Sequence, residues 1–194
     1  MPARSHKYKL RVLASFACLV GALVLAPTAG AEVVTSGGGG ASFVPPPTPP
    51  AKAKLVDGRV IAPASAPRRV KRAITAANRI VEKPYIYGGG HSPFEKGVLA
   101  AGYDCSGAVS YALYGGRFLL SPLPSGSMMS WGRTGPGRWI TVYAHGGHAY
   151  AVIAGFRFDT SMHDADAPGP SSGPRWSRTL RESSAFVARH PRGY

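Results

Sequence analysis

The chain has 194 residues and a formal net charge of +14, with 44% hydrophobic and only 16% charged residues. This length suits one ordinary domain with an additional segment and argues against a second full domain. Two cysteines, Cys18 and Cys105, are too few for a disulfide-dense scaffold or a four-cysteine zinc site. The 25 glycines and 18 prolines indicate an unfolded stretch beside a globular part.

Residues 1–31 have the order of a secretory signal peptide. Four basic residues precede an uncharged, mainly apolar run over 12–26, and the segment ends at Ala31 in an A-x-A pattern. The run is shorter than the roughly 20 residues that span a bilayer. We therefore expect a secreted or wall-associated protein, with retention by an uncleaved N-terminal anchor as the alternative. Cleavage after Ala31 leaves 19 basic and 9 acidic residues, a charge of +10, and one thiol, that of Cys105.

Residues 32–67 follow as a predicted disordered linker. They contain a run of four glycines at 37–40 and seven prolines, five of them within 45–50. Such a composition buries too little apolar surface to offset the entropy of ordering the chain. The segment is expected to act as a spacer, flexible at its glycines and stiff at its prolines.

The predicted domain spans residues 68–194. Apolar residues recur at helical spacing over 68–83, where Pro67 suits a helix start and Pro84 ends the pattern. A short extended piece at 85–87 then leads into three glycines.

A loop over 91–103 precedes the second predicted helix. Asp104 can cap that helix, and Gly115 and Gly116 can close it. The helix would therefore begin at Cys105.

The second half of the domain favours strands. Residues 139–143, 148–154 and 156–160 are rich in β-branched and aromatic residues, and Gly155 separates the last two segments. From residue 162 the chain is polar, with Trp176 as one candidate anchor. Helices first and strands later indicate an α+β fold.

Cys105 is the first candidate for chemistry. At a helix N-terminus, unpaired amide groups and a partial positive charge favour a thiolate over a thiol. A small buried core cysteine is the alternative. Its being the one thiol of an exported chain, beside a charged cap, favours reactivity.

A thiolate nucleophile needs a general base, and that base needs an orienting acceptor. The mature chain has five histidines: His91, His145, His148, His163 and His190. His148 is preferred because it begins an alternating strand, whereas His91 and His163 fall in loops and His190 is near the end. Asp159 lies eleven residues further on, in the next strand.

A two-residue turn at Ala154 and Gly155 would fix the register of these strands. Ile153 would then face Phe156, and His148 and Asp159 would share a face as diagonal neighbours, about 7–8 Å apart. A slip of one residue would place them on opposite faces. The contact therefore depends on the turn.

The motifs Tyr85-Ile86-Tyr87-Gly88-Gly89, Asp104-Cys105-Ser106-Gly107 and Gly147-His148, in this order, resemble those of the NlpC/P60 cysteine peptidases. The resemblance covers roughly residues 70–160. It implies a papain-like α+β domain, with N-terminal helices packed on a small antiparallel sheet, that cleaves peptides of bacterial peptidoglycan.

The resemblance also implies residue roles. Cys105 is the expected nucleophile, His148 the general base and Asp159 the third catalytic residue. Tyr85 would help to hold the oxyanion, and Asp104 and Ser106 would line the site for the free amino end of a stem peptide. The aspartate stands where many members have another histidine or an amide, which indicates a divergent member.

These observations predict an exported cysteine hydrolase that cuts peptidoglycan stem peptides, of the D-glutamyl-diaminopimelate endopeptidase type. The alternatives are a catalytically silent wall-binding protein of the same fold, and an amidase or acyltransferase that uses the same residues. The positive charge suits acidic wall polymers as further partners, and we expect a monomer. No nucleic-acid partner is expected, because export separates the protein from the cytoplasm.

No cofactor or metal is expected either. A metal site built from Cys105, His145 and His148 is disfavoured, because the histidine spacing is unusual for a strand and no carboxylate has ligand spacing.

Overall fold

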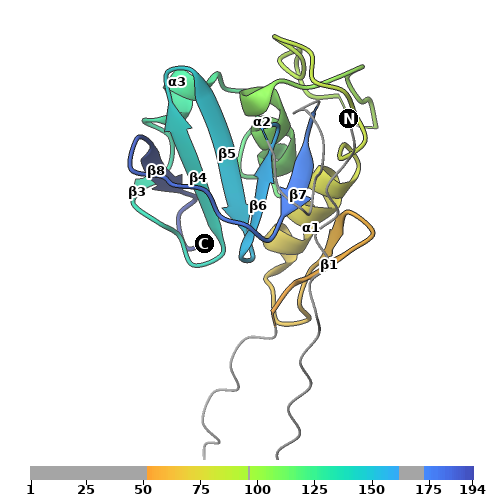
Figure 1. The fold of residues 1–194 in the computed structure, drawn as a ribbon, viewed down its shortest axis with the longest axis vertical. Helices are drawn as coiled ribbons and strands as arrows, with labels where there is room; N and C mark the ends of the chain where they lie inside the picture. Colours follow the sequence, from red (N-terminus) through yellow and green to blue (C-terminus); the bar gives the residue numbers. More distant parts are fainter. Residues whose placement is uncertain (1–51, 96, 162–172) are drawn as a thin grey trace, which may run out of the picture. The chain divides into compact units, whose positions relative to one another are not determined.

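The computed structural model describes residues 52–95, 97–161 and 173–194 (Figure 1). The predicted signal peptide at 1–31 and the glycine- and proline-rich part of the linker lie outside these residues. Among the helices described, none combines the length and the apolar character needed to cross a membrane.

The end of the predicted linker is an ordered hairpin. β1 (Lys54–Val56) pairs antiparallel with β2 (Arg59–Ile61), and Val60 is almost fully buried. Asp57 and Gly58 have φ angles of 47° and 71°, as in the type I′ turn that Asp-Gly favours between apolar residues. The prediction of disorder is therefore wrong for these residues, because the Asp-Gly turn pairs two strands that can bury Val60.

Two helices follow as predicted, and the first of them is shorter than predicted. α1 (Arg68–Asn78) has Pro67 at its N-cap, but it ends five residues before the predicted end at 83. Residues 79–83 continue as tighter turns, with backbone hydrogen bonds three residues apart. Ile80 and Val81 are buried there, so their apolar spacing extends beyond the helix. α2 (Cys105–Gly115) has the predicted N-cap, Asp104.

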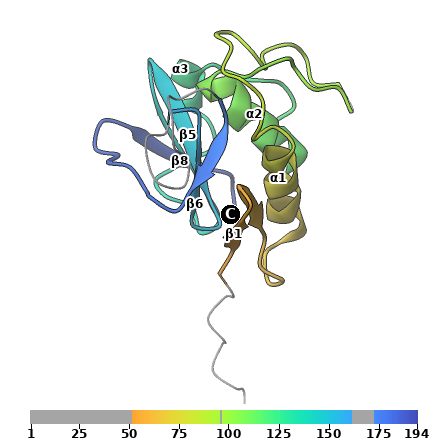
Figure 2. The same ribbon diagram turned by 45° about the vertical axis from the view of Figure 1, so that its right-hand side comes forward.

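The main sheet has six antiparallel strands in the order β3-β8-β4-β5-β6-β7. Its strands are β3 (Arg133–Thr134), β4 (Ile140–His145), β5 (His148–Ile153), β6 (Phe156–Asp159), β7 (Arg175–Ser177) and β8 (Val187–His190). A one-turn helix, α3 (Ser125–Met128), precedes it. Helices α1 and α2 lie on one side of this sheet (Figure 2), with α2 against β5 and β6. The α+β prediction is confirmed.

The hairpin β5–β6 has the predicted register. Ile153 pairs with Phe156 and Ala151 with Phe158, and the two turn residues Ala154 and Gly155 have φ angles of 51° and 88°. A two-residue turn with both angles positive matches the twist of the flanking strands. His148 and Asp159 consequently lie on the same face of the sheet.

Residues 173–194 contribute more to the fold than their polar composition indicates. β7 and β8 extend the sheet on both sides of the hairpin pair β4–β5, with β8 inserted between β3 and β4. Trp176 is 1% exposed, packs on Phe158 with ring centroids 4.8 Å apart, and donates a hydrogen bond to Asn78 Oδ1. Its role as an anchor is confirmed, whereas the two strands were not predicted.

Candidate active site

Cys105 is the first residue of α2, as the capping pattern predicts. The side chain of Asp104 caps the helix, because its Oδ1 accepts the Gly107 N–H at 2.7 Å. The Cys105 side chain is thus held where free backbone amides surround the first helical turn. The residue is 9% exposed and forms no disulfide within the described residues.

The glycine-rich turn after Tyr87 packs directly on this helix start. Asp104 N–H donates to the Gly89 carbonyl at 3.1 Å, and Gly88 N–H donates to Asp104 Oδ2 at 3.1 Å. A Cβ atom at Gly107 would collide with the Gly89 carbonyl oxygen, so the close approach requires glycine there. The resembling motifs therefore meet in space because the turn and the helix start hydrogen-bond to each other.

His148, the first residue of β5, lies between Asp159 and Cys105. Its Nε2 is 2.9 Å from Asp159 Oδ1. A second hydrogen bond joins the His148 side chain to that of Cys105. Burial lowers the pKa of His148, but the hydrogen bonds to Asp159 and Cys105 outweigh it and raise that pKa to about 9.

The same contact acts on the thiol in the opposite direction. Burial raises the pKa of Cys105, but hydrogen bonds from the His148 side chain and the Ala149 backbone outweigh burial. The net result is a pKa below the ordinary thiol value. A lowered thiol pKa beside a raised imidazole pKa favours a thiolate–imidazolium pair.

Asp159 is 2% exposed and is surrounded by positive groups. Its Oδ1 accepts the Ser161 N–H at 3.0 Å, and its Oδ2 accepts from Arg181 Nη1 at 3.1 Å. Arg157 Nε lies 3.7 Å from the same Oδ2. These contacts offset the cost of burying the carboxylate beside His148.

Arg181 and Phe186 are site residues that the sequence does not reveal. The Arg181 guanidinium lies 5.4 Å from the Tyr150 ring centroid and 5.2 Å from that of Phe186. The Phe186 ring in turn contacts His148, at 6.3 Å between centroids. Both residues belong to the C-terminal polar segment, which has no motif, so only the tertiary structure brings them to the site.

Tyr85 lies close to the thiol. It is 42% exposed, and burial followed by the negative charge of Cys105 raises the pKa of its phenol. The hydroxyl therefore remains protonated and can donate a hydrogen bond at neutral pH. The isolated bridge between Tyr85 and Tyr103 holds its backbone beside the residue that precedes Asp104.

Asp104 and Ser106 flank the thiol and are bonded to a histidine that the sequence placed in a loop. His91 Nε2 lies 2.9 Å from Asp104 Oδ1 and 3.2 Å from Ser106 Oγ. Ser106 Oγ also donates to Asp104 Oδ1 at 3.2 Å. The Asp104 carboxylate thus already accepts several hydrogen bonds, and His91 joins the predicted substrate-binding pair.

The described residues contain no group of three histidines, cysteines or acidic residues placed to hold a metal ion. His145, which belongs to the disfavoured metal hypothesis, instead accepts the Gly147 N–H on Nδ1 at 3.0 Å. Its ring centroid is 6.4 Å from that of His148.

Comparison with known proteins gives matches only among solved structures. No family model matches the sequence, and no curated protein matches it either.

The similar structures carry NlpC/P60 domains at low sequence identity. The P60 domain of a Mycobacterium avium subspecies paratuberculosis antigen is 24% identical over 63% of this chain and 94% of its own, with a TM-score of 0.46. RipB of Mycobacterium tuberculosis, a peptidoglycan hydrolase, is 27% identical over 64% of this chain and 68% of its own, with a TM-score of 0.45. RipD of the same species is described as non-catalytic and adapted to peptidoglycan binding. It is 19% identical over 64% of this chain and 98% of its own, with a TM-score of 0.44.

Proposed function

We propose that the chain is a cysteine hydrolase of the NlpC/P60 type that cleaves an amide bond in peptidoglycan stem peptides. The observation that carries the proposal is the line of hydrogen bonds from the Cys105 thiol through His148 to Asp159, which is 2.9 Å from the imidazole. The bond proposed is the one between D-glutamate and diaminopimelate, which rests on the motif resemblance alone.

The proposed reaction begins with the Cys105 thiolate. Its Sγ attacks the amide carbonyl carbon and forms a tetrahedral oxyanion, which the Cys105 backbone N–H at the helix start and the Tyr85 hydroxyl can stabilise. The imidazolium of His148 then protonates the departing amine, the C–N bond breaks and a thioester remains.

Water completes the cycle. Neutral His148 takes a proton from the water as its oxygen attacks the thioester. The carboxylic acid leaves, and the C–S bond breaks to restore the thiolate–imidazolium pair. Asp159 orients the imidazole through Nε2 and stabilises its positive charge during both steps.

The surroundings of the thiol suit a peptide substrate. Tyr85, Ile86 and Tyr87 are exposed large side chains on the segment that leads into the glycine turn. Exposed aromatic and aliphatic side chains of this kind can pack on a bound chain. Asp104 and Ser106, together with His91, supply the polar groups for its amino end.

Export is part of the proposal, because peptidoglycan lies outside the cytoplasm. It rests on the signal-peptide pattern of residues 1–31 and the mature charge of +10. A wall-binding protein without turnover is the alternative function, and the positive net charge favours it as much as it favours a hydrolase. An amidase or acyltransferase would use the same three residues on another bond or acceptor.

Digestion of defined muropeptides with the purified chain, followed by mass analysis of the products, tests the proposal. We expect cleavage by the wild type and its loss in Cys105→Ala and His148→Ala, because each removes a reacting group. A His145→Ala variant is the matched control, since His145 starts the same turn and lies outside the proposed line; it should retain cleavage.

Two results would contradict the hydrolase. Products formed equally by Cys105→Ala would exclude the thiol mechanism. Binding of muropeptides without any product, by a wild type whose folded state is verified by circular dichroism, would identify the silent binder instead.

A further inference from the structure

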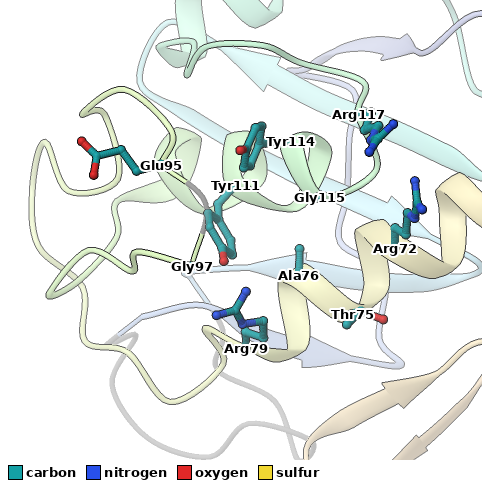
Figure 3. A pocket seen from close by; sticks show the side chains of 10 residues that line it. All are labelled: Arg72, Thr75, Ala76, Arg79, Glu95, Gly97, Tyr111, Tyr114, Gly115 and Arg117. Carbon is teal, nitrogen blue, oxygen red and sulfur yellow. The ribbon is translucent and has the colours of Figure 1, made fainter.

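A pocket with a volume of about 340 Å³ lies between α1 and the C-terminal end of α2 (Figure 3). Volumes of this size are typical of small-molecule sites. Its lining includes Tyr111, Tyr114 and Gly115, which follow Cys105 by six to ten residues on the same helix. At 1.5 Å per residue they lie about 9–15 Å along the axis from the thiol, so this pocket is separate from the candidate active site.

Three arginines line the pocket. Arg72 lies on α1, Arg79 is the C-cap of that helix about two turns further on, and Arg117 follows the end of α2. Among the residues described, none of the three guanidinium groups forms an ion pair with a carboxylate. Glu95 is the one acidic residue in the lining, and Figure 3 shows its carboxylate directed away from the arginines.

The positive charges at one end of this pocket repel each other. The pKa of Arg72 is lowered, first by the charge of Arg68, then by slight burial and by the charge of Arg117. Arg68 is not among the residues that line the pocket, so an anion in the pocket would relieve the part of this repulsion that acts between Arg72 and Arg117. The arrangement therefore favours a negatively charged ligand.

Arg117 has a backbone conformation that is unfavourable for arginine. Its φ is 60°, and it occupies the position after the α2 C-cap where glycine is usual. The Phe118 N–H bonds to the Leu113 carbonyl and the Arg117 N–H to that of Tyr114, as in a Schellman motif. A non-glycine residue in the left-handed region is a strained choice that points to a role for its side chain.

Two tyrosines add neutral donors to the pocket. Burial is the main cause that raises the pKa of Tyr111, so its hydroxyl stays protonated at neutral pH. Tyr114 lies one turn further along α2 and lines the same space. Figure 3 shows the Tyr111 hydroxyl on the side of Arg79.

We propose that this pocket binds phosphate groups of an anionic, phosphate-bearing polymer. Figure 3 shows Arg72 and Arg117 at one end of the pocket and Arg79 at the other, and Arg79 follows Arg72 by seven residues, about 10 Å along the helix axis. One small anion does not span that distance, whereas successive phosphates of one polymer do, and arginine is a preferred partner of phosphate. The pocket would hold the polymer while the Cys105 site remains open, and the inference does not depend on hydrolysis.

Calorimetric titration of the purified chain with a short glycerol-phosphate oligomer tests the site. We expect binding in the wild type and in Cys105→Ala. The Kd should rise by about tenfold or more in Arg79→Gln/Arg117→Gln, which loses two charge-assisted contacts. The control is Arg138→Gln/Arg192→Gln, which removes the same charge from two exposed arginines outside the pocket lining and should bind like the wild type.

Arg117→Gly separates binding from folding. Glycine suits the backbone of position 117, so its Tm should not fall, while the Kd should rise by about tenfold. An unchanged Kd in Arg117→Gly, equal weakening in the Arg138/Arg192 control, or tighter binding of an oligoglutamate of equal charge would each overturn the proposal.

Discussion

At the scale of single residues, the state of the Cys105 thiol depends on two opposing effects. Burial disfavours the thiolate, while the imidazolium of His148 and the Ala149 backbone favour it, and the favourable contacts prevail. His148 in turn keeps its proton up to a pKa of about 9 because Asp159 accepts a hydrogen bond from it. The thiolate of Cys105 and the imidazolium of His148 are therefore expected to coexist at pH values above the lowered pKa of Cys105 and below about 9.

The pH profile of Cys105 alkylation tests this pairing without any substrate. The rate of labelling by iodoacetamide should rise with a midpoint below the ordinary thiol value of 9.0. In His148→Gln the midpoint should move to higher pH, because burial then acts without the imidazolium. Asp159→Asn should move it in the same direction by a smaller amount, since it lowers the pKa of His148.

His145→Gln is the control for the labelling experiment and should retain the wild-type midpoint. A midpoint that is the same in the wild type and in His148→Gln would show that the imidazole does not act on the thiol.

At the scale of secondary-structure elements, the hairpin β5–β6 brings His148 and Asp159 together. Its two-residue turn sets the register that places both on one face. β7 holds β6 in place, because in the backbone register of these two strands Arg175 lies opposite Asp159 and Trp176 lies opposite Phe158. Loosening of β7 would therefore reach the carboxylate that orients His148.

Trp176→Ala should lower the free energy of unfolding by about 3–5 kcal/mol, the usual cost of removing a large buried aromatic. The substitution also removes the indole hydrogen bond to Asn78 Oδ1 at 2.8 Å. Urea denaturation followed by circular dichroism measures the change.

Trp176→Phe is the matched comparison, because it keeps most of the apolar volume and loses the hydrogen bond. Its destabilisation should be clearly smaller than that of the alanine variant. A decrease of less than about 1 kcal/mol in the free energy of unfolding of Trp176→Ala would contradict the anchoring role, because surface substitutions have effects of that size.

At the scale of the domain, the sheet combines the strands β3 to β6, which follow α3, with β7 and β8 from the C-terminal segment. β8 lies between β3 and β4, and β7 forms the edge beyond β6, so the C-terminal residues pair with strands far away in sequence. The same C-terminal region supplies Arg181 to Asp159 and Phe186 to the ring of His148. The C-terminal segment is therefore part of the domain core and of the candidate site.

A chain truncated after Ser161 should fail to fold cooperatively. It would lose β7, β8 and the buried indole of Trp176, and it would expose the β4 and β6 strand edges. Deletion of residues 1–51 is the contrasting variant and removes none of the described core residues. Thermal melts should show a cooperative transition in the variant that lacks residues 1–51 and none in the chain truncated after Ser161. A cooperative melt of the truncated chain would contradict the role assigned to the C-terminal strands.

Local patterns in the sequence were sufficient for part of this description. Capping by Asp104 placed Cys105 at a helix start, and the Ala154-Gly155 turn set the strand register. Both depend on interactions between residues close in sequence, which backbone propensities report directly. The Asp57-Gly58 hairpin also had such a pattern, and the proline-rich composition around it hid the signal.

The sequence by itself determined the α+β class, the position of Cys105 and, given the turn at Ala154 and Gly155, the face that His148 and Asp159 share. Only the tertiary structure decided that β8 enters the sheet, that His91 joins Asp104, that Arg181 neutralises Asp159, and that three arginines line one pocket. The physical reason is distance along the chain. Capping and tight turns are local, whereas strand insertion and charge pairing between distant residues follow from packing that no short pattern records.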